Sequence, residues 1–247
     1  MCSTYDVLPT PSNLHTWGLV ESPSCKLCGK TANLEHVLSS CHSSLADGKF
    51  RWRHDQILAQ LADGVEQASK KARQLSKGPR FIHFVRAGGS PAAGGRSKGV
   101  LATASDWEMR ADLKKQLKFP EEIAHTSLRP DIVLWSKGTK QVVLMELTVP
   151  WEERIEEAYE RELKKYQALI LESQQNGWKA WNLPVEVGCR GFAGRSLWRA
   201  LGLLGIEGPA RKRLVANTTK RAEEASRWIW IQREVRWQSR PTEGLKA

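Results

Sequence analysis

The feature that most constrains the fold is a group of three cysteines and one histidine. Cys25, Cys28, His36 and Cys41 follow one another in the pattern C-x2-C-x7-H-x4-C. Two cysteines two residues apart, followed by Gly29, can form a tight turn that points both thiolates at one ion. Four such ligands close a tetrahedron without a position for water, which is typical of structural zinc. The pattern therefore predicts a zinc knuckle whose folding energy comes mainly from the metal.

Other interpretations of these cysteines stay open at this stage. His42, next to Cys41, is a substitute ligand, and a reduced cysteine pair without metal is the alternative to any zinc site. The chain has five cysteines, an odd number that suits a disulfide framework poorly. Metal binding is thus favoured over disulfides.

The charge of the chain favours a polyanionic partner. Its 38 lysines and arginines outnumber 27 acidic residues, so the net charge is +11. Such a balance suits DNA or RNA, although a merely solvated basic surface is the alternative. We expect an intracellular protein without a membrane partner, because neither a secretory signal nor an apolar run of about 18 residues occurs.

The chain divides into four predicted regions. A knuckle region (1–49) precedes a basic helical connector (50–85), in which 50–75 is predicted to be helical. The segment 86–99 contains five glycines and a proline, which predicts a flexible linker. The remainder, 100–240, is predicted to be one α/β domain.

Hydrophobic periodicity predicts the order helix, β-hairpin, helix, strand and helices within the α/β domain. The expected elements are a helix at 106–117, capped by Ser105 or Asp106, hairpin strands at 129–135 and 141–149, a helix at 151–175, a strand at 181–189 interrupted at Pro184, and helices at 194–204 and 210–237.

Two carboxylates mark the predicted hairpin. Asp131 opens its first strand, and Glu146 interrupts an almost wholly apolar second strand. A carboxylate buried in such a strand needs a cation, because burial of an unpaired charge costs roughly several kcal/mol of folding free energy. Paired strands can place the two acids side by side, where a divalent ion such as Mg²⁺ would relieve their repulsion. A salt bridge to Arg129 or Lys140 is the alternative.

The following helix carries further charged residues on its apolar side. At about 100° per residue, Glu162 falls in the middle of the apolar face and Lys165 at its edge, whereas Lys164 points into solvent. We expect Glu162 and Lys165 to turn toward the same metal as Asp131 and Glu146. An ordinary surface pair between residues three apart is the alternative.

These residues together resemble a known family. Arg129-Pro-Asp-Ile-Val133, Glu146-Leu-Thr-Val-Pro-Trp-Glu152 and Lys165-Tyr166 are similar to the restriction-like endonuclease at the C-terminus of site-specific non-LTR retrotransposon proteins, a branch of the PD-(D/E)xK superfamily. Such proteins also carry a Cys-Cys-His-Cys knuckle before the nuclease, and Phe50 to Leu58 resembles the element that follows it. The resemblance covers about residues 8 to 235.

The resemblance implies a restriction-endonuclease-like core and an enzyme that nicks DNA to free a 3′-hydroxyl for reverse transcription. Asp131 and Glu146 correspond to its acids for Mg²⁺ or Mn²⁺. Thr148 stands where the superfamily usually has lysine. Lys165 in the next helix can take the place of that lysine and is expected to activate the attacking water or to steady the phosphate. Relatives often carry lysine where this chain has Glu162, which is expected either to act as an additional ligand or to support the other ligands from behind. Glu108 corresponds either to the additional acid that some superfamily members use at the metal site or to an ordinary residue exposed to solvent.

The resemblance also bears on partners and location. It implies a nuclear protein that acts with a reverse transcriptase encoded elsewhere, since the expected polymerase does not precede the knuckle; a fragment, a decayed copy and a host-retained gene all fit. Basic residues in both domains are expected to track DNA phosphates. They are Arg51, Arg53, Arg86, Arg96, Lys98, Arg211, Lys212 and Arg213.

Two other functions compete with the nuclease. One is a zinc-containing nucleic-acid-binding module whose nuclease fold no longer cuts, and the chemistry around Glu162, Lys164 and Lys165 decides between them. The other is a structural zinc protein that docks to another protein through its 11 tryptophans, although tryptophans more often fill cores.

Overall fold

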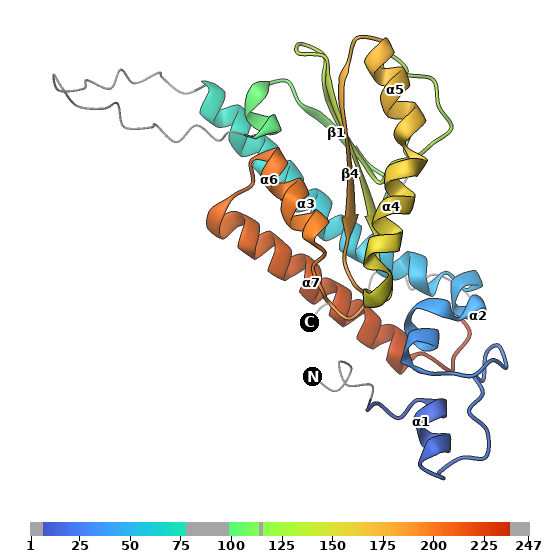
Figure 1. The fold of residues 1–247 in the computed structure, drawn as a ribbon. Coiled ribbons are helices and arrows are strands. Elements are labelled where there is room, and N and C mark those ends of the chain that lie inside the picture. The colour runs from blue at the N-terminus through green and yellow to red at the C-terminus, as the bar shows by residue number, and fades with distance from the viewer. Residues whose placement is uncertain (1–6, 78–98, 114–115, 238–247) are drawn as a thin grey trace.

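The computed structural model describes residues 7–77, 99–113 and 116–237, and its centre is a four-stranded mixed sheet (Figure 1). The strands lie in the order β1 (Glu108–Ala111), β2 (Ile132–Ser136), β3 (Gln141–Thr148) and β4 (Lys179–Glu186). Neighbours are antiparallel except β3 and β4, which are parallel. The predicted hairpin is thus confirmed as β2 and β3, and the chain is α/β.

Helices cover both faces of the sheet, which explains why β2 and β3 are apolar throughout (Figure 1). The crossover from β3 to β4 contains η3 (Glu152–Arg154), α4 (Ile155–Lys165) and α5 (Gln167–Gln175), and α5 packs on one face with Val142 and Leu144. The other face packs against α3 (Lys49–Lys77), η2 (Val100–Thr103), α6 (Arg195–Leu204) and α7 (Gly208–Ile231).

The predicted helix at 106–117 is wrong, because β1 occupies part of it. Met109 and Ala111 pack toward the core while Glu108 is exposed, a strand-like alternation. Pairing with β2 overrides the helix propensity of this short segment. Asp106 caps no helix; its carboxylate accepts from the Ser136 hydroxyl at 2.6 Å and the Gly138 amide at 2.8 Å in the β2–β3 turn.

Two further elements differ in detail from the prediction. The helix expected at 151–175 breaks at Tyr166 into α4 and α5, and ends as predicted at Asn176, before Gly177 with φ +79°. The third strand is not interrupted at Pro184, since β4 is an edge strand, where proline is tolerated. The helices predicted at 50–75, 194–204 and 210–237 correspond to α3, α6 and α7, although α7 ends at Ile231.

The N-terminal region is built of short elements around the cysteines. It contains α1 (Pro11–Thr16), η1 (His36–Ser40) and α2 (His42–Ala46). Leu34 and Leu38 share one hydrophobic core with Cys189 after β4 and Ile229 of α7. The predicted knuckle region is therefore packed onto the α/β part of the chain. The predicted linker, except Gly99, lies outside the described residues.

Candidate functional site

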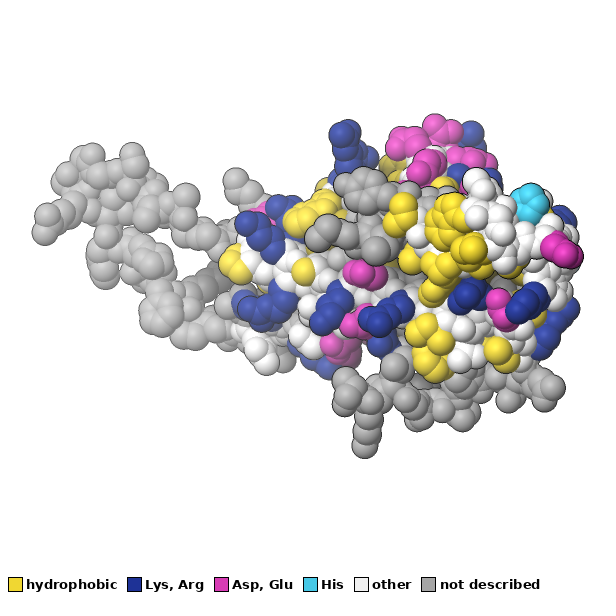
Figure 2. Space-filling model, turned by 90° about the horizontal axis from the view of Figure 1, so that it is seen from below, with side chains coloured by type: hydrophobic (Ala, Val, Ile, Leu, Met, Phe, Trp, Pro, Cys, Tyr) yellow, Lys and Arg dark blue, Asp and Glu magenta, His cyan; other side chains and the backbone are white. Residues whose placement is uncertain are grey.

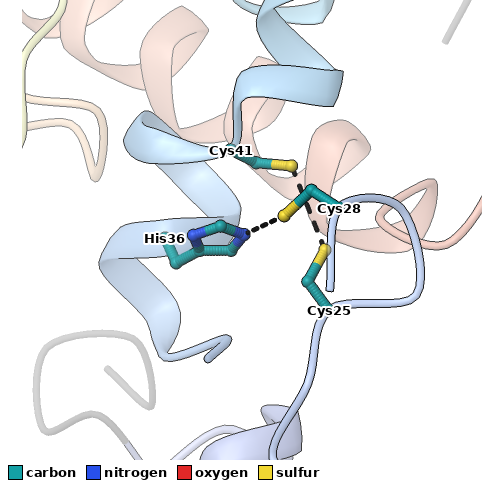
Figure 3. A group of neighbouring side chains, drawn as sticks. All are labelled: Cys25, Cys28, His36 and Cys41. Atoms are coloured by element: carbon teal, nitrogen blue, oxygen red, sulfur yellow. Dashed lines mark hydrogen bonds between the residues drawn. The ribbon is translucent and has the colours of Figure 1, made fainter. Parts of the chain in front are cut away.

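The cysteine-containing loop has the geometry of a metal-binding knuckle. The Cys25 amide donates to the Lys30 carbonyl at 2.7 Å, and the Gly29 amide donates to the Cys25 carbonyl at 2.8 Å. Gly29 has φ +74°, a conformation that a side chain would strain. This turn directs the side chains of Cys25 and Cys28 to the same side (Figure 3).

The second ligand pair comes from the helical turn η1. His36 starts this turn and Cys41 follows it, so both face the knuckle (Figure 3). The Sγ atoms of Cys25 and Cys41 are 3.9 Å apart, and Cys28 Sγ lies 3.2 Å from His36 Nε2. All four ligand atoms lie within 4.8 Å of one another. The four side chains therefore form the predicted Cys3His group, which fits tetrahedral zinc.

The protonation of His36 suits a metal ligand. Burial lowers its pKa, which favours the neutral imidazole that coordinates metal. Its backbone amide donates to Asn33 Oδ1 at 2.8 Å, which fixes the start of the turn. His42 is exposed and does not belong to the group.

A second polar cluster lies where β2 begins and β3 ends. Asp131 and Glu146 are 5% and 8% exposed. The backbone amide of Asp131 donates to Glu146 Oε2 at 3.1 Å, and the amide of Leu147 donates to Asp131 Oδ2 at 2.8 Å. Burial, and then the charge of Asp131, raise the pKa of Glu146. The two acids are thus close neighbours, as the hairpin predicts.

His54 of α3 contacts Asp131 of this pair. Its Nε2 lies 3.0 Å from Asp131 Oδ2 and 3.1 Å from the Leu147 carbonyl, and its Nδ1 lies 3.3 Å from Asp55. Burial opposes a charge on the ring, but the bonds to Asp131 and Asp55 outweigh it and raise the pKa of His54 to about 9. An imidazolium therefore compensates the buried Asp131 carboxylate at neutral pH.

Lys165 and Tyr166 complete the surroundings of Glu146. Lys165 Nζ donates to Glu146 Oε1 at 2.6 Å and lies 3.4 Å from Glu162 Oε2. The Tyr166 hydroxyl donates to Glu146 Oε2 at 2.9 Å. Glu162 is buried, Lys165 is 40% exposed and Lys164 is 77% exposed, so the predicted orientation of this helix face is confirmed.

Neither expected salt bridge partner holds Glu146. Its cation is Lys165 rather than Arg129 or Lys140. Asp131 and Glu146 offer the hard oxygen atoms that Mg²⁺ prefers. Among the His, Cys, Asp and Glu side chains of the described residues, however, only Cys25, Cys28, His36 and Cys41 form a group of three or more close enough for one ion. The carboxylates are instead bonded to Lys165, Tyr166 and His54.

The predicted phosphate-contacting residues occupy different environments. Arg53 is 2% exposed and donates to the Leu38 carbonyl at 2.8 Å, the Val149 carbonyl at 3.3 Å and the Ser226 hydroxyl at 3.1 Å. It is therefore an interior residue, a correction to the expectation for it. Arg51 is 47% exposed and pairs with Asp55 and Asp112.

The basic residues of α7 are more accessible. Lys212 and Arg213 are exposed, and Arg211 lies over the Trp198 ring. Figure 2 shows that Lys and Arg side chains on the face seen from below are interspersed with acidic and apolar ones. Arg86, Arg96 and Lys98 lie outside the described residues. Glu108 is exposed on β1, 3.9 Å from Lys137, and away from Asp131.

His54 and the Tyr166 hydroxyl are two functional groups that the sequence patterns did not predict. His54 stands three and four residues before the buried Ile57 and Leu58, so it lies on the apolar face of α3. A titratable residue on such a face indicates a buried partner. Tyr166 is fully buried, and its hydroxyl oxygen also lies 3.1 Å from the Arg129 carbonyl, so that its one proton faces two acceptors.

No protein-family model and no curated protein matches the chain. Within the described residues, no helix is both long enough and apolar enough to span a membrane. The assignment of function therefore depends on the sites themselves.

Proposed function

We propose that the protein is a divalent-metal-dependent endonuclease that nicks DNA, with a structural zinc site in its knuckle. The observation that carries the proposal is the constellation around Glu146. A buried carboxylate lies 2.6 Å from a lysine and accepts the backbone amide of a second buried acid, Asp131. Two acids and a lysine at one sheet end are the groups that metal-assisted phosphodiester hydrolysis uses.

The proposed reaction is hydrolysis of one phosphodiester bond. A water oxygen attacks phosphorus, the bond from phosphorus to the 3′ oxygen breaks, and that oxygen takes a proton, which leaves a 3′-hydroxyl and a 5′-phosphate. Mg²⁺ or Mn²⁺, when bound by Asp131 and Glu146, would offset phosphate charge and lower the pKa of the attacking water.

Lys165 is proposed to steady the phosphate. Burial opposes its charge, but the hydrogen bond and charge of Glu146 raise its pKa, so the side chain is an ammonium at neutral pH. An ammonium donates hydrogen bonds to phosphate oxygens and does not accept a proton from water. Its partial exposure leaves it accessible to a substrate. Glu162, 3.4 Å away, positions the ammonium.

His54 and the knuckle are proposed to support the site. His54 orients Asp131 through its 3.0 Å contact, and α3, which carries it, begins shortly after Cys41. Zinc in the Cys3His group would fix the start of this segment. The exposed Lys212 and Arg213 are proposed to contact DNA phosphates. A nuclear location and a reverse transcriptase as partner are part of the same proposal.

The alternative is a zinc-containing nucleic-acid-binding module that does not cut. One observation favours it: both carboxylates already have protein partners, and Thr148 stands where the superfamily has lysine. A metal bound there would compete with Lys165, Tyr166 and His54 for the lone pairs of these oxygens. This module would share the zinc and the DNA affinity but not the nicking.

Incubation of the purified protein with supercoiled plasmid and Mg²⁺ tests the proposal. Wild-type protein is expected to convert plasmid to the open circular form, and Asp131→Asn, which keeps the side-chain shape, is expected to abolish this. Glu157→Asn, at an exposed position of α4, is the control. Equal nicking by wild type and Asp131→Asn would assign the cutting to a contaminant, whereas DNA binding without nicking would favour the inactive module.

A further inference from the structure

A buried carboxylate whose oxygens have no hydrogen-bond partner lies at the end of β4, near the Ser196 hydroxyl, which accepts from the Glu186 amide at 3.2 Å. Glu186 is 0% exposed, and neither of its side-chain oxygens has a hydrogen-bond partner. No ion pair involves it among the described residues. A buried carboxylate of this kind is costly, so an unpartnered one in a native protein requires an explanation, for which a bound ion is a recognised candidate.

Oxygen atoms of two neighbouring residues point to the same explanation. Thr148 is the β3 residue opposite Glu186, and its Oγ1 is also buried without a hydrogen-bond partner. Glu162 Oε2 is buried and has only its 3.4 Å contact with Lys165. The Asn182 side chain of β4 donates to the Glu162 carbonyl at 3.5 Å. Glu162 of α4 therefore lies over the strand that ends in Glu186.

A recess in the protein surface borders Glu186. A cavity of about 390 Å³ is lined by Glu152, Glu156, Tyr159, Glu186, Arg195 and Arg199, among others. Glu152 is paired with Arg190 at 2.6 Å, whereas Glu156 is exposed at the surface. A small hydrated cation can enter a recess of this size and acidity, which explains how Glu186 would be reached.

We propose that Glu186, Thr148 and Glu162 bind a divalent metal ion of the Mg²⁺ or Mn²⁺ type. The atoms concerned are oxygens of a hydroxyl and two carboxylates, and such hard ions take one or two carboxylates while keeping several waters. Thiolates and imidazoles, which would favour zinc, are absent from this set.

This site differs from the Asp131–Glu146 pair. Thr148 lies two residues beyond Glu146 on β3, about 7 Å along the strand, and Glu186 lies on the neighbouring strand. The proposal does not depend on nuclease activity, because its evidence is the set of unpartnered oxygens. It stands even if the protein binds nucleic acid without cutting it.

Electron paramagnetic resonance of free Mn²⁺ counts the ions bound per chain. The comparison is between wild type, Glu186→Gln, which keeps the shape but loses the charge, and Glu157→Gln at an exposed position of α4 as the matched control. Glu186→Gln is expected to bind one ion fewer than wild type and Glu157→Gln the same number. An equal count for Glu186→Gln and wild type would overturn the proposal.

Two further variants keep the test decisive. Thr148→Val retains the side-chain shape and is expected to weaken Mn²⁺ binding by at least about tenfold, as loss of a group that supports a metal does. This variant carries the test if Glu186→Gln does not fold, and unchanged Mn²⁺ affinity in it would then overturn the proposal. Asp131→Asn distinguishes the two sites. This variant should lose plasmid nicking but should still bind the Mn²⁺ ion that is missing in Glu186→Gln.

Discussion

His54 Nε2 lies 3.0 Å from Asp131 Oδ2, although 77 positions separate the two residues in sequence. The contact joins the helix that follows the knuckle to the first acid of the hairpin. It also places the imidazolium of His54 beside a carboxyl group that is only 5% exposed.

Replacement of His54 should destabilise the protein and impair the proposed nicking. His54→Asn removes the cation beside a buried carboxylate, so the free energy of unfolding should fall by about 3 kcal/mol. Urea denaturation measures this loss. His125→Asn, at an exposed position, should change it by less than about 0.5 kcal/mol.

The contribution of His54 should also depend on pH. Its folded pKa of about 9 lies above its ordinary value of 6.5, so its stabilisation is complete below pH 6.5 and is lost as the pH rises through 9. The stability difference between wild type and His54→Asn should therefore shrink between these values. A constant difference from pH 6 to pH 10 would contradict the assigned ion pair.

The two adjacent lysines of α4 should differ sharply in effect. Lys165→Met removes the ammonium from Glu146 and should reduce plasmid nicking at least about a hundredfold, a typical effect of one charged group that stabilises a transition state. Lys164→Met, at a 77% exposed position paired with Glu160 at 3.9 Å, should leave nicking unchanged. Equal losses in both variants would indicate nonspecific DNA attraction rather than a role at the site.

Loss of zinc should loosen a core that extends beyond the knuckle. His36→Asn is expected to lose the metal, whereas His42→Asn should retain it, because His42 is not in the ligand group. Cys189 packs in the same core as the ligand cysteines and lies 3.5 Å from Ser39. Mass spectrometry after thiol labelling should find Cys189 modified in His36→Asn alone. Full zinc content in His36→Asn would contradict the ligand assignment.

Replacement of Arg53 should lower stability, whereas replacement of Arg213 should weaken DNA binding. Arg53→Met leaves the Leu38 and Val149 carbonyls without their donor and should cost about 3 kcal/mol of unfolding free energy. Arg213→Gln should barely alter stability but should reduce the slope of log affinity against log salt by about one. DNA titrations at several salt concentrations measure this slope. An unchanged slope in Arg213→Gln would exclude a phosphate contact there.

Glu186 should make stability fall as the pH rises in the absence of divalent ions. Its folded pKa of about 7 exceeds the ordinary 4.5, so the folded state holds the proton more tightly. Between these pH values, wild type should lose about 3 kcal/mol relative to Glu186→Gln. Unfolding free energies of both proteins across this range provide the measurement. A parallel pH dependence of the two would show that Glu186 has an ordinary pKa.

Local patterns in the sequence were sufficient for the hairpin, the long amphipathic helices and the Cys3His group. Cys25 and Cys28 are two residues apart with Gly29 beside them, and backbone geometry alone then directs both thiolates to one side. The helical period also predicted which side chains of α4 face the core, since Glu162 is buried and Lys164 is exposed, as predicted.

Tertiary structure alone decided the features that depend on distant segments. Pairing with β2 made 108–111 a strand, against its local preference for helix. The identity of the cation beside each acid, His54 for Asp131 and Lys165 for Glu146, and the burial of Arg53 arose in the same way. Periodicity determines which face of an element is apolar, but the partner of a buried charge depends on how elements pack, because Coulomb attraction and desolvation act through space rather than along the chain.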